Sequence, residues 1–365
     1  MDTSGTETIL MHDDSDSWST VMKRMKLAVF ACAAILALCA FFGSCSDDQP
    51  TEPNGGADTT SHSFIWYTDT LGEDLSRIND VFCLSEDDAW AVGYFYVRDE
   101  DTGQINHLKT ANVAHWDGEE WTLMRVEPRV DGLGTFAEAW AVFGWIHDDI
   151  WVDNRHWNGK SWTAFNMNGI AHGRGRKIWG NRTDNIFIVG EKGSILRWDG
   201  SGFTEFGSQT TAANLDIWGC DDTMYVAVSD YDQQSGNWGY LIRLENGKVV
   251  GTEQAGSDVM ITVWGMDGTW YSGGCQGVFR KTGDSWQRVL APGPCVTGIR
   301  GTALNNVYIL VQRGQVIHFN GSNFATILPQ QPEGMYTGRI STSGKMVMAT
   351  GYLGPYAVVK RGYQQ

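Results

Sequence analysis

The chain of 365 residues contains 43 acidic and 27 basic side chains, which gives a formal net charge of −16 at pH 7. This excess of negative charge repels phosphate backbones and anionic lipid head groups, so we exclude nucleic acid as a partner and expect no electrostatic attachment to a membrane. The chain also contains 44 glycines and 17 tryptophans, and is thus rich in turn residues and in large aromatic side chains.

The N-terminal part has the features of a secretory signal. Basic residues within 22–27 precede an apolar run from Leu27 to Phe42, which is shorter than the roughly 20 residues that span a bilayer. The run ends in Phe42-Gly43-Ser44-Cys45, which resembles a bacterial lipobox except that Phe42 stands where Leu is usual. The resemblance implies lipidation of Cys45. The alternative is an uncleaved membrane anchor with an incidental cysteine.

These features divide the chain into four parts. Residues 1–21 are polar and acidic, and we interpret them as a non-native extension before a start at Met22 or Met25. Residues 22–44 form the predicted signal peptide, and residues 45–61 form a flexible acidic tether too polar to bury a core. Residues 62–365 form the folded domain. By resemblance to lipoprotein sorting signals, Ser46 favours the outer membrane, facing the periplasm or the cell surface, with the lipid as the only membrane contact.

A turn motif recurs along the folded part. Trp116-Asp117-Gly118-Glu119-Glu120-Trp121 returns as Trp157-Asn158-Gly159-Lys160-Ser161-Trp162. The motif glycines follow one another at steps of 36 to 47 residues, at Gly118, Gly159, Gly200, Gly247, Gly283, Gly321 and Gly362. A period near forty with strand-like segments between turns is typical of a β-propeller.

Each repeat is predicted to contain four short strands. An inner strand carries Ile-Trp-Gly or a variant, as at 178–180, 217–219 and 263–265, and the Asp-Gly or Asn-Gly turn joins the third strand to the fourth. The last repeat lacks a fourth strand, and residues near 63–70 resemble one. We therefore predict an all-β, seven-bladed β-propeller, whose ring is closed by an N-terminal strand that completes the last blade.

Twelve of the seventeen tryptophans occupy motif positions, so we expect them to pack the core and the interfaces between blades. Over residues 62–365 the chain resembles bacterial secreted lipoproteins with propellers built from Ile-Trp-Gly, Val-Trp-Ala-Val-Gly and Trp-Asp-Gly-x-x-Trp repeats. This resemblance implies the architecture and leaves the activity open.

Two insertions, at 94–111 and 229–240, exceed what the blades need and are predicted to lie on one face. Their candidate ligand-binding residues are Tyr94, Tyr96, Arg98, Tyr231, Trp238 and Tyr240. These side chains suit stacking on sugars or contact with a protein loop. The alternative is that the aromatic rings pack only against their own loops.

Three further candidates, Arg176, Arg300 and Arg339, lie at or beside the inner strands. Clustered at the channel mouth, they would bind carboxylates or sulfates, as in sialidases. The Asp-Gly turn resembles the Asp-box of sialidase-type propellers, but that family's Arg-Ile-Pro segment and its tyrosine–glutamate pair are not found.

The cysteines and acidic turns complete the candidates. Cys275 and Cys295 are predicted to share a face and to form a disulfide, whereas Cys83 and Cys220 are expected to be buried thiols. The acidic groups at 86–88, 148–149 and 221–222 recur at one turn position and are interpreted as solvated turns. Because neither the histidines nor the cysteines have metal-ligand spacing, we expect no metal and no cofactor.

The leading hypothesis is a monomeric, non-enzymatic, membrane-tethered binding or scaffold module that recognises a protein or a glycan through loops on one propeller face. The alternative is a carbohydrate-active enzyme, a glycoside hydrolase or lyase, at the channel mouth. That alternative requires two carboxylates about 5–10 Å apart in a concave site.

Overall fold

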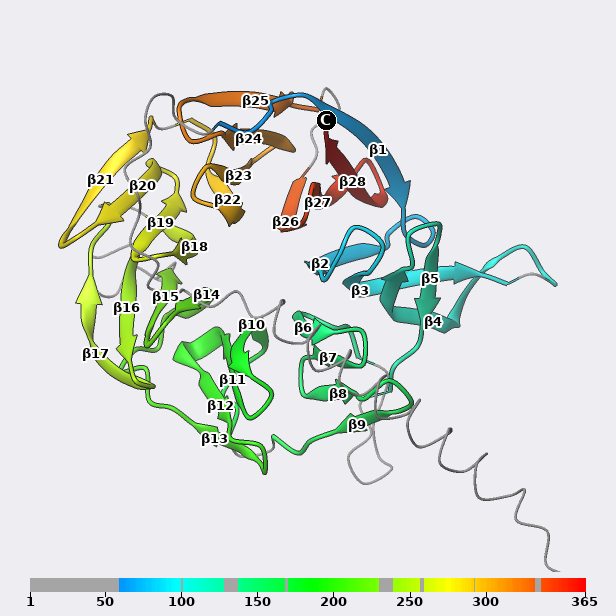
Figure 1. Cartoon of the computed structure of the whole chain (residues 1–365). Helices are drawn as coiled ribbons and strands as arrows, with labels where there is room; N and C mark the ends of the chain where they lie inside the picture. Colours follow the sequence, from blue (N-terminus) through cyan, green and yellow to red (C-terminus); the bar gives the residue numbers. More distant parts are fainter. Residues whose placement is uncertain are drawn as a thin grey trace, which may run out of the picture. The chain divides into compact units, whose positions relative to one another are not determined.

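The short strands and tight turns of the repeats fold into a ring of sheets (Figure 1). The computed structural model describes residues 59–99, 101–127, 137–167, 170–229, 239–256, 259–291, 293–331 and 336–365. In these ranges, 28 strands form seven four-stranded antiparallel sheets, and the only helical element is the 3-10 turn η1 (Glu191–Gly193). The predicted all-β, seven-bladed propeller is confirmed. No helix within the described ranges is long and apolar enough to cross a membrane.

Six blades take their four strands in chain order from the centre of the ring to its rim (Figure 1). Blades 1 to 3 consist of β2 (Arg77–Cys83), β3 (Ala89–Arg98), β4 (Ile105–Trp116) and β5 (Trp121–Met124); β6 (Val142–Ile146), β7 (Asp149–Val152), β8 (Arg155–Trp157) and β9 (Trp162–Ala164); and β10 (Gly175–Arg182), β11 (Asn185–Gly190), β12 (Ile195–Trp198) and β13 (Phe203–Glu205). Blades 4 to 6 consist of β14 (Ala213–Cys220), β15 (Thr223–Ser229), β16 (Gly239–Glu245) and β17 (Lys248–Glu253); β18 (Met260–Met266), β19 (Thr269–Gly274), β20 (Gly277–Thr282) and β21 (Ser285–Leu290); and β22 (Val296–Ala303), β23 (Asn306–Val311), β24 (Gln315–Phe319) and β25 (Phe324–Leu328).

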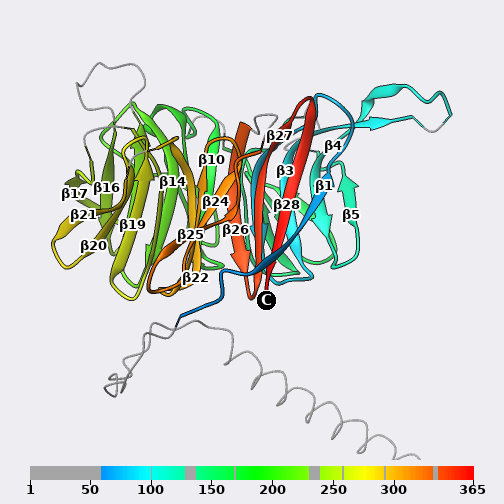
Figure 2. The ribbon, with the colours of Figure 1, turned by 90° about the horizontal axis from the view of Figure 1, so that it is seen from above.

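Blade 7 joins the two ends of the described chain. Its strands β26 (Tyr336–Ser343), β27 (Met346–Leu353) and β28 (Tyr356–Gln364) are completed at the rim by β1 (Phe64–Thr70), which pairs antiparallel with β28 (Figures 1 and 2). The predicted closure is confirmed. Gly362, however, lies inside β28 opposite Trp66 rather than in a turn, because β28 continues to Gln364 and pairs with β1 over this length.

The Ile-Trp-Gly motif sets the packing between neighbouring blades. The tryptophan of one blade lies against the motif glycine of the next, and a Cβ added to Gly219 would come within 2.3 Å of the Trp179 ring. The same relation joins Gly301 to Trp264, where the separation would be 2.7 Å. Trp264 and Trp151 are buried, at 0% and 2% exposure. These contacts support the expected packing role of the motif tryptophans.

The third-to-fourth strand turns are held by side-chain oxygens. In blade 1, Asp117 Oδ1 accepts hydrogen bonds from the backbone N–H groups of Glu119 and Glu120, both at 2.9 Å. Gly118 follows at φ +98°, a conformation that favours glycine. These backbone donors lower the pKa of Asp117.

Candidate functional site

The centre of the ring is filled with polar side chains. In each blade, one residue comes just before the Ile or Val of the inner-strand motif. These residues are Asp80, Ala141, Lys177, Asp216, Thr262, Gly298 and Arg339. Five of the seven are polar or charged.

One ion pair joins blades 1, 2 and 3. Lys177 Nζ lies 2.7 Å from Asp80 Oδ1, and Asp80 Oδ2 accepts a hydrogen bond from the Val142 N–H at 3.1 Å. Both charged side chains are buried. Burial lowers the pKa of Lys177, although the Asp80 charge acts in the opposite direction.

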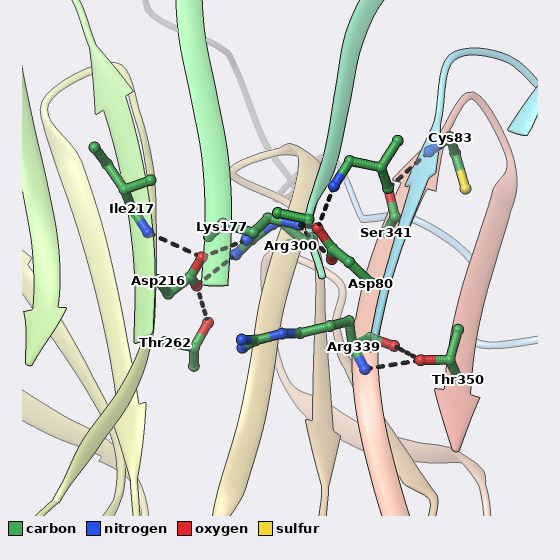
Figure 3. A network of polar contacts seen from close by, with 12 residues as sticks. Asp80, Cys83, Lys177, Asp216, Ile217, Thr262, Arg300, Arg339, Ser341 and Thr350 are labelled. Carbon is green, nitrogen blue, oxygen red and sulfur yellow. Dashed lines mark hydrogen bonds and ion pairs between the residues drawn. The ribbon is translucent and has the colours of Figure 1, made fainter. Parts of the chain in front are cut away.

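A second ion pair joins blades 4, 5 and 6 (Figure 3). Arg300 donates to both carboxylate oxygens of Asp216, at 2.7 and 3.0 Å, and the Thr262 hydroxyl donates to Oδ2 at 2.7 Å. Burial acts to raise the pKa of Asp216, but the charge and hydrogen bonds of Arg300 bring it below its usual value. Asp216 therefore remains a carboxylate, and it accepts hydrogen bonds from Arg300, from the Thr262 hydroxyl and from the Val263 N–H.

Arg339 extends across the channel from blade 7 toward blade 4 (Figure 3). Its Nη2 donates to the Leu215 carbonyl at 3.1 Å. Arg176 has other partners: it lies 2.5 Å from Glu191 and stacks over the Trp140 ring at 4.8 Å. Arg300 and Arg339 both act on Asp216 through their charge, whereas Arg176 belongs to the Glu191–Trp140 contact.

The ion pairs limit what the channel can do chemically. Asp80 and Asp216 are each bound to a buried cation. Asp153 lies near Asp80 and accepts hydrogen bonds from the backbone N–H groups of Trp140 and Ala141, and burial raises its pKa. A general acid must carry a proton at working pH, and the lowered pKa of Asp216 opposes this. Asp216 therefore does not suit the role of general acid that the alternative of a carbohydrate-active enzyme requires.

The blade 1 insertion forms a long hairpin that extends β3 and β4 away from the ring (Figure 1). Tyr94 and Tyr96 are half-buried, and their rings meet edge to face at 5.0 Å. Arg98 pairs with Glu73 at 2.7 Å and donates to the Gly103 carbonyl at 2.5 Å. These contacts bind the hairpin to itself and to a neighbouring loop, which favours the packing interpretation for these three residues.

The blade 4 insertion includes Tyr231 and Trp238, which lie outside the described residues, as does the predicted lipidation site Cys45. Tyr240 is described and lines a groove between blades 3 and 4. Two cavities of about 430 and 830 Å³ share Ser208, Gln209 and Tyr240 as lining residues. The Tyr240 hydroxyl donates to Thr210 Oγ1 at 2.7 Å, which fixes the ring at the edge of the groove.

The groove is built from segments with no sequence motif. Its inner wall is the connection that leads from β13 to β14, where Ser208 and Thr210 lie, and its outer wall is β17, with Val249 and Val250. The connection contains polar residues and a glycine, a composition that is typical of loops and does not indicate a binding site. The one sequence signal pointing here was the long insertion that ends at Tyr240.

A disulfide joins Cys275 and Cys295, whose Cα atoms are 4.0 Å apart. Cys275 follows β19, a second strand, and Cys295 precedes β22, a first strand, so these two kinds of connection share one face. We call it the loop face, and the groove and the blade 1 hairpin belong to it. Cys83 is buried, which raises the pKa of its thiol to about 12, whereas Cys220 is only half-buried.

No model of a known protein family matches this chain, and no curated protein is similar to it in sequence. Solved structures of similar fold exist. One, described as YCF48 bound to D1 peptide, has a TM-score of 0.61 at 12% identity, covering 85% of this chain and 98% of the other. The WD40 propeller domain of Doa1 has a TM-score of 0.58 at 12% identity, with coverage of 85% and 97%. A catalytically inactive virginiamycin B lyase from Staphylococcus aureus with quinupristin has a TM-score of 0.62 at 11% identity, with coverage of 83% and 100%. At these identities the likeness shows the propeller fold alone.

Proposed function

We propose that this propeller is a non-enzymatic binding module that holds an extended protein segment in the groove between blades 3 and 4. The observation that carries the proposal is the polar groove at Tyr240, with its two adjoining cavities. Ligand sites are concave and combine apolar contacts with a few placed polar groups. Val249 and Val250 supply the first, and the exposed side chain of Gln209 supplies the second.

The outer wall of the groove favours a protein segment over a glycan. β17 is the last strand of its sheet, so one of its edges has no neighbouring strand in that sheet. An extended segment can pair with such an edge through main-chain hydrogen bonds. Val250 is 52% exposed on this strand and would contact the side chains of the segment. A propeller of similar fold has been solved bound to a peptide, which supports a protein segment as the ligand.

The features of the N-terminal residues support a proposal for where the protein is located in the cell. Residues 22–44 would direct export, Cys45 would carry the lipid, and residues 45–61 would separate the propeller of residues 62–365 from an outer membrane. Metabolic labelling with a palmitate analogue tests this, because labelling should disappear in Cys45→Ser.

A displayed library of random peptides, selected on the full chain, tests the groove. We expect selected peptides to bind at least tenfold more weakly to Tyr240→Ala and Val250→Lys, because both changes alter the walls of the groove. The matched control is Val289→Lys, since Val289 is 36% exposed on β21, the equivalent outer strand of blade 5.

Binding that is equally weakened by Val289→Lys, or that is unchanged in both groove variants, would contradict the proposal. A glycan array probed with the same proteins provides the other arm. If the protein binds a glycan but no peptide, and Tyr240→Ala abolishes that binding, the ligand of the groove is a sugar and not a protein segment.

A further inference from the structure

Three side chains with metal-binding groups meet on the face opposite the loop face. Asp88 lies in the turn between β2 and β3, His115 lies in β4, and His147 lies in the turn between β6 and β7. His115 Nε2 is 2.9 Å from Asp88 Oδ1, and His147 Nδ1 is 3.1 Å from Asp88 Oδ2. One ligand atom from each residue lies within 4.8 Å of the others, and no other such group of three occurs in the described ranges.

Part of this arrangement is a regular feature of the blades. In blade 2, His156 Nε2 lies 2.7 Å from Asp149 Oδ1, and in blade 6, His318 Nε2 lies 2.8 Å from Asn306 Oδ1. In each case the imidazole also stacks on an aromatic ring of the second strand, such as Trp151 at 4.7 Å. A carboxylate or amide beside a third-strand histidine therefore has a structural role. What distinguishes blade 1 is His147, supplied by the neighbouring blade.

We infer that Asp88, His115 and His147 bind a divalent transition-metal ion, with Zn²⁺ as the expected occupant. Imidazole and carboxylate groups are ligands that Zn²⁺ accepts, at bond lengths of about 2.0–2.2 Å. In a tetrahedral site with such bonds, neighbouring ligand atoms are roughly 3.3 Å apart. The two histidines approach different oxygens of Asp88, at 2.9 and 3.1 Å, and the three ligand atoms lie within 4.8 Å of one another. The most distant ligand atoms would therefore have to approach each other by up to about 1.5 Å on metal binding.

A second group of contacts positions the ligands. The Trp90 indole N–H donates to Asp88 Oδ1 at 3.0 Å, and the Trp90 ring packs on the His115 ring at 4.4 Å. Contacts of this kind fix the orientation of metal ligands. The His147 side chain is 57% exposed, so the site opens to solvent and leaves a fourth position for water or for a ligand atom from a partner.

The experiment is a Zn²⁺ titration of the full chain by isothermal calorimetry after treatment with a chelator. We expect His147→Ala to bind Zn²⁺ at least tenfold more weakly, a difference of about 1.4 kcal/mol. The matched control is His156→Gln, which breaks the equivalent pair in blade 2 and should leave the affinity unchanged. Because His147 is largely exposed, the variant should keep the melting temperature of the metal-free protein.

Two further readouts separate this site from binding elsewhere in the chain. Co²⁺ should give visible absorption bands with the wild-type protein that are absent in His147→Ala. Saturating Zn²⁺ should raise the melting temperature of the wild-type protein and not that of the variant. Equal Zn²⁺ affinity of the wild-type protein and His147→Ala, or an equal loss in His156→Gln, would overturn the inference.

Discussion

Arg300 stands at the motif position that holds tryptophan in the neighbouring strand, where the sequence reads Val263-Trp264-Gly265. A guanidinium at this position reaches the channel and pairs with Asp216 of blade 4. Both side chains are buried, so each charge depends on the other for compensation. From sequence alone, Ile299-Arg300-Gly301 is only a variant of the Ile-Trp-Gly motif, and the interaction with Asp216 is not predicted.

We therefore expect Arg300→Met to lower the free energy of unfolding by about 3–5 kcal/mol, because it leaves the Asp216 charge buried without its cation. Urea denaturation measures the change. Arg182→Met is the control: the Arg182–Asp184 pair is 71% and 45% exposed, and its loss should cost less than about 1 kcal/mol. Equal effects of the two substitutions would contradict the argument.

His318 should make the stability of the protein depend on pH. Its side chain is buried, and burial together with the neighbouring His62 lowers its pKa to about 4. The unfolded chain has a histidine pKa of about 6.5, so the unfolded state takes up the proton first as the pH falls. The contribution of neutral His318 to the free energy of unfolding is fully present above about pH 6.5 and is lost as the pH falls to about 4.

Melting temperatures measured from pH 7.5 to 4 should fall for the wild-type protein more steeply than for His318→Gln. A matched control is His172→Gln, because His172 is 56% exposed. Identical slopes for the wild-type protein and His318→Gln would show that His318 does not titrate in this way.

At the scale of elements, the connections on the loop face differ in how they are held. The blade 1 hairpin is fixed by its own ion pair and ring contacts, and the connection before β14 is fixed by Ser208 and Thr210. The connection from blade 5 to blade 6 is instead tied by the Cys275–Cys295 disulfide, across a separation of 20 residues.

Closing a loop of this length restricts the unfolded chain, and we expect the double substitution Cys275→Ala, Cys295→Ala to lower the free energy of unfolding by roughly 3 kcal/mol. Denaturation with and without reductant measures it. Reductant should lower the stability of the wild-type protein and leave the double variant unaffected. A reductant effect of similar size in both proteins would point to another cause.

The whole molecule depends on closing the ring. β1 supplies the outermost strand of blade 7, and the Trp66 indole donates to the Ile327 carbonyl of blade 6 at 2.9 Å. Buried hydrophobic residues from adjacent blades pack together, as where Val81 of blade 1 shares a cluster with Val359 of blade 7. The closing strand therefore protects both a sheet edge and an interface between blades.

Removing residues 1–70 should lower the melting temperature and increase aggregation, because β28 then becomes an open edge. Removing only residues 1–58 leaves β1 intact and should preserve the melting temperature. Differential scanning calorimetry with light scattering compares the two. Equal melting temperatures would show that β1 contributes little to the closed ring.

The sequence was sufficient for the fold because its signals are local and repeated. Asp-Gly and Asn-Gly turns, alternating strands and Ile-Trp-Gly motifs each specify a short segment, and the repeat period then determines a propeller. Even the closing strand was recognisable, since residues near 63–70 resemble the other fourth strands. Gly362 was wrongly predicted to be a turn because it follows Gly321 at the repeat period, whereas in the structure it pairs with Trp66 of β1.

The candidate sites were decided by tertiary structure. Arg300 and Asp216 are 84 residues apart, and Asp88 and His147 are 59 apart, so no spacing rule could join either pair. The groove at Tyr240 arises where two blades meet. Local residue chemistry determined the turns, the strands and the number of blades. Only the closed ring determined which distant charges and imidazoles became neighbours, because contacts between blades depend on the radial position of each strand rather than on its place in the chain.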